Sequence, residues 1–132
     1  MATILDTDVV IHLRDGDPWI EDQVRGLILP LYISAITRVE LENGVEGDPQ
    51  QTRLRALLDK ILVYVSTLDF TTAEVEAYRD IIEATGYSRR KTADRMTAAT
   101  ALVHGLTLVT LNGRDFRDVP GLKLLEWERP EA

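Results

Sequence analysis

Apolar residues follow two alternating patterns along the chain: short continuous runs, and longer stretches with helical spacing. The short runs predict buried strands at 2–5, 31–35, 63–66, 106–111 and 122–127. The longer stretches predict helices at 9–14, 19–29, 37–46, 50–62, 71–84 and 92–103. Alternating strands and helices predict one α/β domain over residues 1–132, built on a parallel sheet with right-handed crossovers.

Four acidic residues occupy equivalent places in this pattern. The carboxyl ends of parallel strands and the N-termini of the helices that follow them share one edge of the sheet, where ligands bind. Asp6 and Asp115 each follow a predicted strand, and Glu40 and Asp94 lie in the first turns of predicted helices. We therefore expect all four carboxylates to meet at that edge.

Each of the four also has an ordinary structural explanation. Asp6 and Asp94 could cap helices, and Asp115 could be a turn residue. Glu40 could complete a capping box with Thr37. Only the expected convergence of all four favours a functional site.

Two neighbouring acids are interpreted differently. Glu42 lies about 200° around the helix from Glu40, so the two side chains cannot face one site. Arg38, four residues before Glu42, gives it a surface partner. Asp8 could be a further acid of the site or a helix cap.

Carboxylates brought together repel one another, and burial raises their pKa values. A bound Mg²⁺ or Mn²⁺ offsets both effects, since hard cations prefer oxygen ligands. Such an ion can activate water and stabilise charge on a phosphoryl oxygen. The four acids therefore predict metal-dependent phosphodiester chemistry.

Composition narrows the possible classes. A formal net charge of −7 argues against loose binding to nucleic acid, and the lack of cysteine excludes disulfides and thiolate metal sites. No uninterrupted apolar run is long enough to span a membrane, and the N-terminus does not resemble a signal peptide. We expect a cytoplasmic protein.

Four segments resemble the successive motifs of PIN-domain ribonucleases, and the set is most similar to the VapC-type toxins of bacterial toxin–antitoxin pairs. The segments are residues 4–11, 33–44, 94–102 and 108–116, and residues 119–125 fit the closing motif. The resemblance implies a PIN-like three-layer sandwich with a mainly parallel sheet in the order 3-2-1-4-5. It also implies RNA cleavage with Mg²⁺ or Mn²⁺, with the catalytic and metal-binding acids at Asp6, Glu40, Asp94 and Asp115.

The same resemblance implies partners and supporting residues. A small cognate antitoxin is expected to shield the site, the protein is expected to be a homodimer, and transfer RNA is a common target in the family. Polar residues expected to support the acids are Thr7, Asp8, Thr110 and Asn112. Asp8 and Gly113 depart from the residues that are usual at their positions.

Three other functions fit parts of the sequence. Asp6-Thr-Asp-Val matches the opening of haloacid-dehalogenase-type phosphatases, with Asp6 as nucleophile, although no lysine stands in a convincing context. A non-catalytic acidic receiver or interaction module would explain the fold and the acidic pocket. A metal-free ribonuclease could use His12 and His104 as base and acid.

A short basic segment leads into Asp94. Arg89, Arg90 and Lys91, together with Arg95, could hold RNA phosphates that flank the scissile one. The alternative is an ordinary solvated loop.

Overall fold

The computed structural model of the chain describes residues 2–130 and contains one five-stranded parallel sheet. The strand order, β3-β2-β1-β4-β5, is the order that the family resemblance implied. The strands are β1 (Thr3–Leu5), β2 (Leu31–Ser34), β3 (Val65–Leu68), β4 (Thr107–Thr110) and β5 (Lys123–Glu126). No helix within residues 2–130 is long and apolar enough to cross a membrane.

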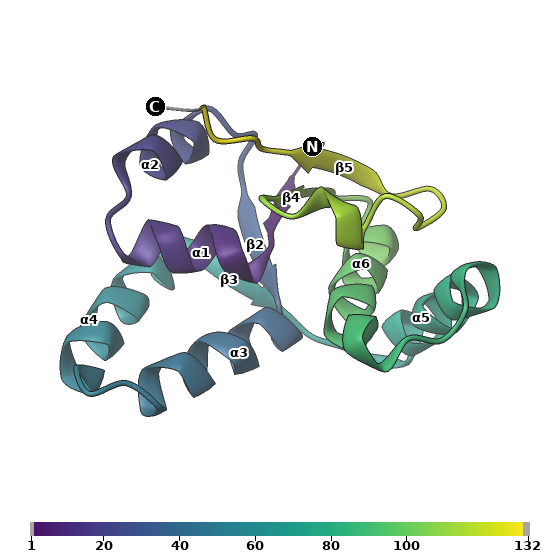
Figure 1. The fold of residues 1–132 in the computed structure, drawn as a ribbon, viewed down its shortest axis with the longest axis horizontal. Helices are drawn as coiled ribbons and strands as arrows, with labels where there is room; N and C mark the ends of the chain where they lie inside the picture. The colour runs from purple at the N-terminus through teal and green to yellow at the C-terminus, as the bar shows by residue number, and fades with distance from the viewer. Residues whose placement is uncertain (1, 131–132) are drawn as a thin grey trace.

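Helices cover both faces of the sheet and complete the expected three layers (Figure 1). One face packs against α1 (Thr7–Arg14), α2 (Pro18–Arg25), α3 (Ala35–Glu46) and α4 (Gln51–Ile61), and the other against α5 (Thr72–Thr85) and α6 (Thr92–His104). Two short 3₁₀ turns, η1 (Arg89–Lys91) and η2 (Gly113–Asp115), precede α6 and follow β4. Each face buries its own apolar cluster, and the mainly small residues of α6 let that helix lie close to the sheet.

The start of α3 differs from the prediction, and the difference affects the site. The Ser34 side chain accepts a hydrogen bond from the backbone N–H of Thr37 at 3.0 Å, so Ser34 is the N-cap. The helix therefore begins at Ala35 rather than Thr37, and β2 ends at Ser34. Consequently Glu40 lies in the second turn of α3 rather than the first, and the alternative capping box with Thr37 does not form.

Other element boundaries differ from the predicted ones because the chain forms extra turns where helices end. Helix α2 ends at Arg25 instead of continuing to residue 29, since backbone bonds close tighter turns at Gly26 and Leu27. Strand β3 begins two residues later than predicted, because the chain still turns through residues 62–64 after α4. The basic segment 89–91 is the 3₁₀ turn η1, not an open loop.

Candidate active site

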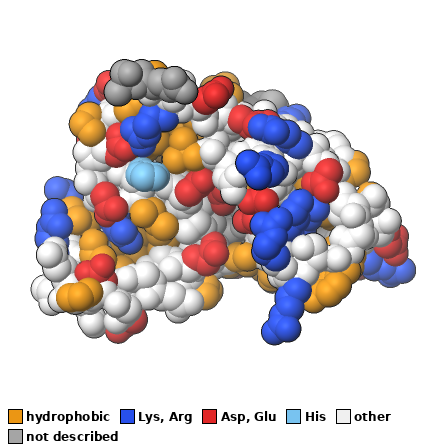
Figure 2. Space-filling view, viewed as in Figure 1, with side chains coloured by type: hydrophobic (Ala, Val, Ile, Leu, Met, Phe, Trp, Pro, Cys, Tyr) orange, Lys and Arg blue, Asp and Glu red, His pale blue; other side chains and the backbone are white. Residues whose placement is uncertain are grey.

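The four predicted acids lie in one pocket at the carboxyl edge of the sheet. The pocket has a volume of about 250 Å³, and its lining residues are Asp6, Thr7, Asp8, Ile11, Glu40, Asp94, Asn112 and Asp115. Figure 2 shows acidic side chains near the middle of this face, bordered on one side by Lys and Arg side chains. Residues from four separate segments of the chain therefore form one polar pocket.

Asp6 lies at the centre of the hydrogen bonds in this pocket. One carboxylate oxygen accepts from the backbone N–H of Thr7 at 2.8 Å, which makes Asp6 the N-cap of α1. The other oxygen accepts from the Thr110 hydroxyl at 2.8 Å. Asp6 is thus a helix cap that also lines the pocket, so the capping explanation does not exclude a role in the site.

Glu40 is held by a hydroxyl from α1. The Thr7 hydroxyl donates to Oε1 of Glu40 at 2.6 Å and lies 2.9 Å from the Thr37 hydroxyl. Thr37 is fully buried, three residues before Glu40 on the same helix face. Sequence reasoning missed Thr37, and its position one turn from Glu40 was the available signal.

Asp115 is placed by the loop that follows β4. The side-chain amide of Asn112 donates to Oδ2 of Asp115 at 2.5 Å, and the backbone N–H of Asn112 donates to the Thr110 hydroxyl at 2.9 Å. On its other side, Asp115 faces the guanidinium of Arg90 at 3.6 Å. The basic turn η1 therefore reaches the rim of the acidic pocket.

Crowding changes the acidity of the site. Burial, followed by the charge of Asp8, raises the pKa of Asp6 from 3.8 to about 7. Burial and the charges of Asp6, Asp115 and Glu40 raise the pKa of Asp94 from 3.8 to about 6. The pocket therefore disfavours several negative charges at once and favours a cation.

Asp8 lies in the same pocket, and burial raises its pKa as well. Its Oδ1 atom is buried and has no hydrogen-bond partner among the described residues. A buried carboxylate oxygen without a partner is costly unless a cation or a proton answers it. Asp8 therefore adds a fifth carboxylate to the pocket, with one buried oxygen that has no partner within residues 2–130.

The prediction that Arg95 contacts RNA is wrong. Its side chain is only 3% exposed and forms a two-pronged ion pair with Asp118, at 2.7 and 2.9 Å. That pair ties α6 to the chain beyond η2. Arg89 and Arg90, in contrast, are exposed.

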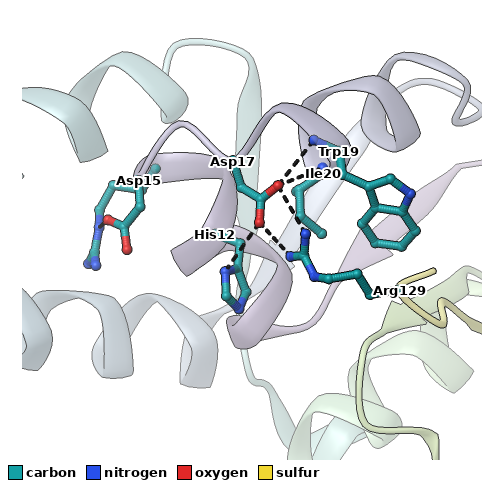
Figure 3. Close-up of polar contacts among 7 residues, drawn as sticks. His12, Asp15, Asp17, Trp19, Ile20 and Arg129 are labelled. Carbon is teal, nitrogen blue, oxygen red and sulfur yellow. Dashed lines mark hydrogen bonds and ion pairs between the residues drawn. The ribbon is translucent and has the colours of Figure 1, made fainter. Parts of the chain in front are cut away.

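The alternative of a metal-free ribonuclease with His12 and His104 as base and acid does not fit the structure. His12 points toward Asp17, with Nδ1 3.7 Å from a carboxylate oxygen (Figure 3). His104 lies at the end of α6, beside the start of β1, and faces Glu74 at 3.5 Å. The two rings are at opposite edges of the sheet, so they cannot act on one bond.

Glu42 behaves as predicted. Arg38 and Arg55 donate to its two carboxylate oxygens at 2.7 and 2.5 Å. The hydrogen bonds from Arg55 and Arg38 lower the pKa of Glu42 to about 2. Two glutamates only two residues apart on α3 therefore have different surroundings, one with arginines and one in the acidic pocket.

Comparison with known proteins identifies the family. The PIN domain family matches residues 3–122. The chain belongs to the PIN domain family. Membership argues against the phosphatase alternative and agrees with an acidic pocket at the carboxyl edge of the sheet.

Individual PIN proteins are similar over nearly the full chain. Ribonuclease VapC1 of Rickettsia felis is 32% identical over 131 residues, covering 95% of this chain and 96% of that protein. The tRNA(fMet)-specific endonuclease VapC of Salmonella typhimurium is 31% identical, covering 94% and 96%. A chain in the crystal structure of DNA-bound VapBC from Salmonella typhimurium superposes with a TM-score of 0.83 at 27% identity, covering 96% and 99%.

Proposed function

We propose that this PIN domain is the endoribonuclease toxin of a toxin–antitoxin pair and that it hydrolyses RNA phosphodiester bonds with Mg²⁺ or Mn²⁺. The observation that carries the proposal is the convergence of Asp6, Glu40, Asp94 and Asp115 in one pocket. Family membership and relatives named as ribonucleases support the same reaction.

The residues present fit a hard divalent cation. The pocket offers carboxylate oxygens and no thiolate, and Asp8 adds a buried oxygen that lacks a partner. Within residues 2–130, no three Asp, Glu or His side chains already form a group that could hold an ion. Because the carboxylates repel one another, a cation would itself stabilise the final grouping.

Asp6, Glu40, Asp94 and Asp115 would hold the ion, which supplies an activated water and stabilises the charge that develops on phosphorus-bound oxygen. The neighbouring hydroxyls fix the carboxylates. Thr110 and the Thr7 amide orient Asp6, the Thr7 hydroxyl orients Glu40, and Asn112 orients Asp115. These hydrogen bonds limit the orientations of Asp6, Glu40 and Asp115, so that less reorganisation is needed when an ion binds.

The basic turn η1 would contact the substrate. Arg89 and Arg90 are exposed, and Arg90 already reaches Asp115 at the pocket rim. Lys91 is next to them, although it also lies near Asp118. We assign these three cations to phosphates that flank the scissile one.

Two of the similar proteins support a proposal about the partners. The Salmonella structure is a VapBC complex, and a Salmonella relative is named for transfer RNA. We propose a cognate antitoxin that covers the acidic pocket, a homodimeric toxin, a transfer RNA substrate and action in the cytoplasm. An acidic pocket of this kind is a suitable receptor for an antitoxin arginine.

The direct test compares two glutamates on one helix. Purified protein should cleave RNA with Mg²⁺ or Mn²⁺ and stop when EDTA is added. Glu40→Gln should lower the rate at least about 100-fold, as the loss of a group that stabilises transition-state charge does. Glu42→Gln is the matched control and should stay near the wild-type rate. Full activity in EDTA, or equal effects of the two variants, would contradict the proposal.

A further inference from the structure

A second polar pocket lies beside the acidic one, on the other side of the loop after β4. Its volume is about 310 Å³, and it is lined by Leu111, Asn112, Gly113, Arg114, Arg117, Glu126, Trp127 and Glu128. Asn112 lines both pockets. We propose that this second pocket binds the base of the RNA nucleotide next to the scissile phosphate, an inference that rests on the proposed ribonuclease function.

The pocket depends on the glycine at position 113. The Glu126 side chain lies directly against Gly113, so a Cβ there would be 1.9 Å from Oε1 of Glu126. Arg117 holds the Glu126 carboxylate with donors at 2.6 and 3.0 Å. Any side chain at 113 would push Glu126 away from the loop and disturb this wall of the pocket.

Trp127 is the one aromatic residue among the described residues that line the pocket. Its indole packs edge-on against Trp19 with ring centroids 6.3 Å apart, and its backbone N–H donates to the Thr110 carbonyl at 2.9 Å. Trp19 is itself covered by Arg129, whose guanidinium carbon is 5.0 Å from the ring centroid. Arg129 also pairs with Asp17 at the start of α2 (Figure 3).

This chain of contacts holds the indole in place before any ligand binds. Every nucleobase has a π face that can stack on an aromatic side chain. A fixed ring also loses little entropy when a base packs against it. A tryptophan in the lining of a polar pocket beside the acidic one therefore suits a nucleotide better than it suits a metal ion or a small anion.

The charged residues that line the pocket indicate where the phosphate and the base of a nucleotide would lie. Arg114 is exposed and makes no hydrogen bond or ion pair with another described residue, so it is available for a phosphate. Glu126 and Glu128 also line this pocket, and the Glu126 carboxylate already accepts hydrogen bonds from Arg117. Carboxylates accept hydrogen bonds from exocyclic amino groups, which guanine, cytosine and adenine carry and uracil lacks. The pocket should therefore disfavour uracil.

The test uses the full chain with Mg²⁺ and a pool of random-sequence RNA, with the bases on both sides of each cut counted by sequencing. Wild type should show uracil depleted at one flanking position. Glu128→Gln should weaken that depletion while cleavage continues. Arg114→Gln should raise KM about fivefold with kcat unchanged, as expected when uniform binding is lost. Glu76→Gln, on the exposed face of α5, is the control and should change neither quantity.

Two results separate this inference from the proposed function. Metal-dependent cleavage with flat base frequencies, or with Glu128→Gln and Arg114→Gln both like wild type, would overturn the pocket alone. The pocket proposal would also be overturned if Glu128→Gln and Arg114→Gln lowered only the affinity for the antitoxin and left RNA cleavage unchanged. If wild type cuts no RNA, the quenching of tryptophan fluorescence by guanosine and uridine 5′-monophosphates tests the pocket. Stronger quenching by guanosine 5′-monophosphate in wild type, lost in Glu128→Gln, would support the proposal. Equal quenching by the two nucleotides, or none, would overturn it.

Discussion

The Thr110 hydroxyl donates a hydrogen bond to Asp6 at 2.8 Å, joining the end of β4 to the end of β1. The same hydroxyl accepts from the backbone N–H of Asn112, which in turn holds Asp115 through its side chain. Thr110 is fully buried. One hydroxyl therefore links two of the four acids across neighbouring strands.

Thr110→Val keeps the shape of this side chain and removes its hydrogen bonds. We expect a loss of about 1–3 kcal/mol in the free energy of unfolding, because the Asn112 amide loses its acceptor. The hydrogen bond from Thr110 lowers the pKa of Asp6, so its loss in the variant should raise that pKa and shift the pH profile of cleavage to higher pH. Urea unfolding and rate–pH profiles measure both effects. Thr100→Val, which removes a buried hydroxyl bonded within α6, should leave the pH profile unchanged.

Stability of the metal-free protein should fall with rising pH. Asp6 and Asp94 have folded pKa values of about 7 and about 6 against 3.8 for the ordinary side chain. Between about pH 4 and pH 7 the folded chain keeps protons that the unfolded chain has released, so raising the pH favours unfolding.

Asp6→Asn tests this pH dependence. We expect it to raise the free energy of unfolding in EDTA by about 2 kcal/mol at pH 8 and by much less at pH 5, one pKa unit being worth about 1.4 kcal/mol. The expectation is below the full shift of Asp6, because Asp8 shares the repulsion. Asp80→Asn, on the exposed face of α5, is the control. Equal effects of Asp6→Asn at the two pH values would refute the prediction.

Replacing Arg95 and replacing Arg90 should affect different properties, the first stability and the second RNA binding. Arg95→Ala removes a buried arginine and its two hydrogen bonds to the half-exposed Asp118, and should lower the free energy of unfolding by about 2 kcal/mol. Arg90→Ala changes an exposed side chain and should alter stability by less than about 0.5 kcal/mol. Its RNA affinity should fall, and the slope of log affinity against log salt should shrink by about 1. Thermal melts measure the stability of the two variants, and binding titrations at several salt concentrations measure their RNA affinity. Equal results for Arg95→Ala and Arg90→Ala would contradict the prediction.

Expression in bacteria tests the toxin assignment. Wild type expressed alone should slow growth, Asp94→Asn should not, and co-expression of a small protein with a basic tail encoded beside the gene should restore growth. Growth curves with matched protein levels measure this. Harmless expression of a protein that cleaves RNA in the test tube would contradict the toxin role while leaving the enzyme intact.

The fold was largely predictable because most elements carry clear apolar periodicity. Boundaries failed where a single hydrogen bond decides them, as at Ser34, whose side chain caps α3. Topology correctly predicted that Glu40 lies at this edge of the sheet, whereas the alternative capping box with Thr37 does not form because Ser34 caps the helix. The prediction that Arg95 contacts RNA failed because the sequence does not show which basic side chains near a site are exposed. The Arg95 side chain is buried and donates to Asp118 instead.

The chemical ends of the RNA fragments test the central claim most directly. Asp6, Glu40, Asp94 and Asp115 would hold a metal ion that supplies an activated water, and hydrolysis by such a water would break the bond between phosphorus and the ribose 3′ oxygen. We predict fragments with 5′ phosphates and 3′ hydroxyls, formed only when Mg²⁺ or Mn²⁺ is present, and degradable by an exonuclease that requires a 5′ phosphate. Fragments that end in 2′,3′-cyclic phosphate with a free 5′ hydroxyl would contradict the account.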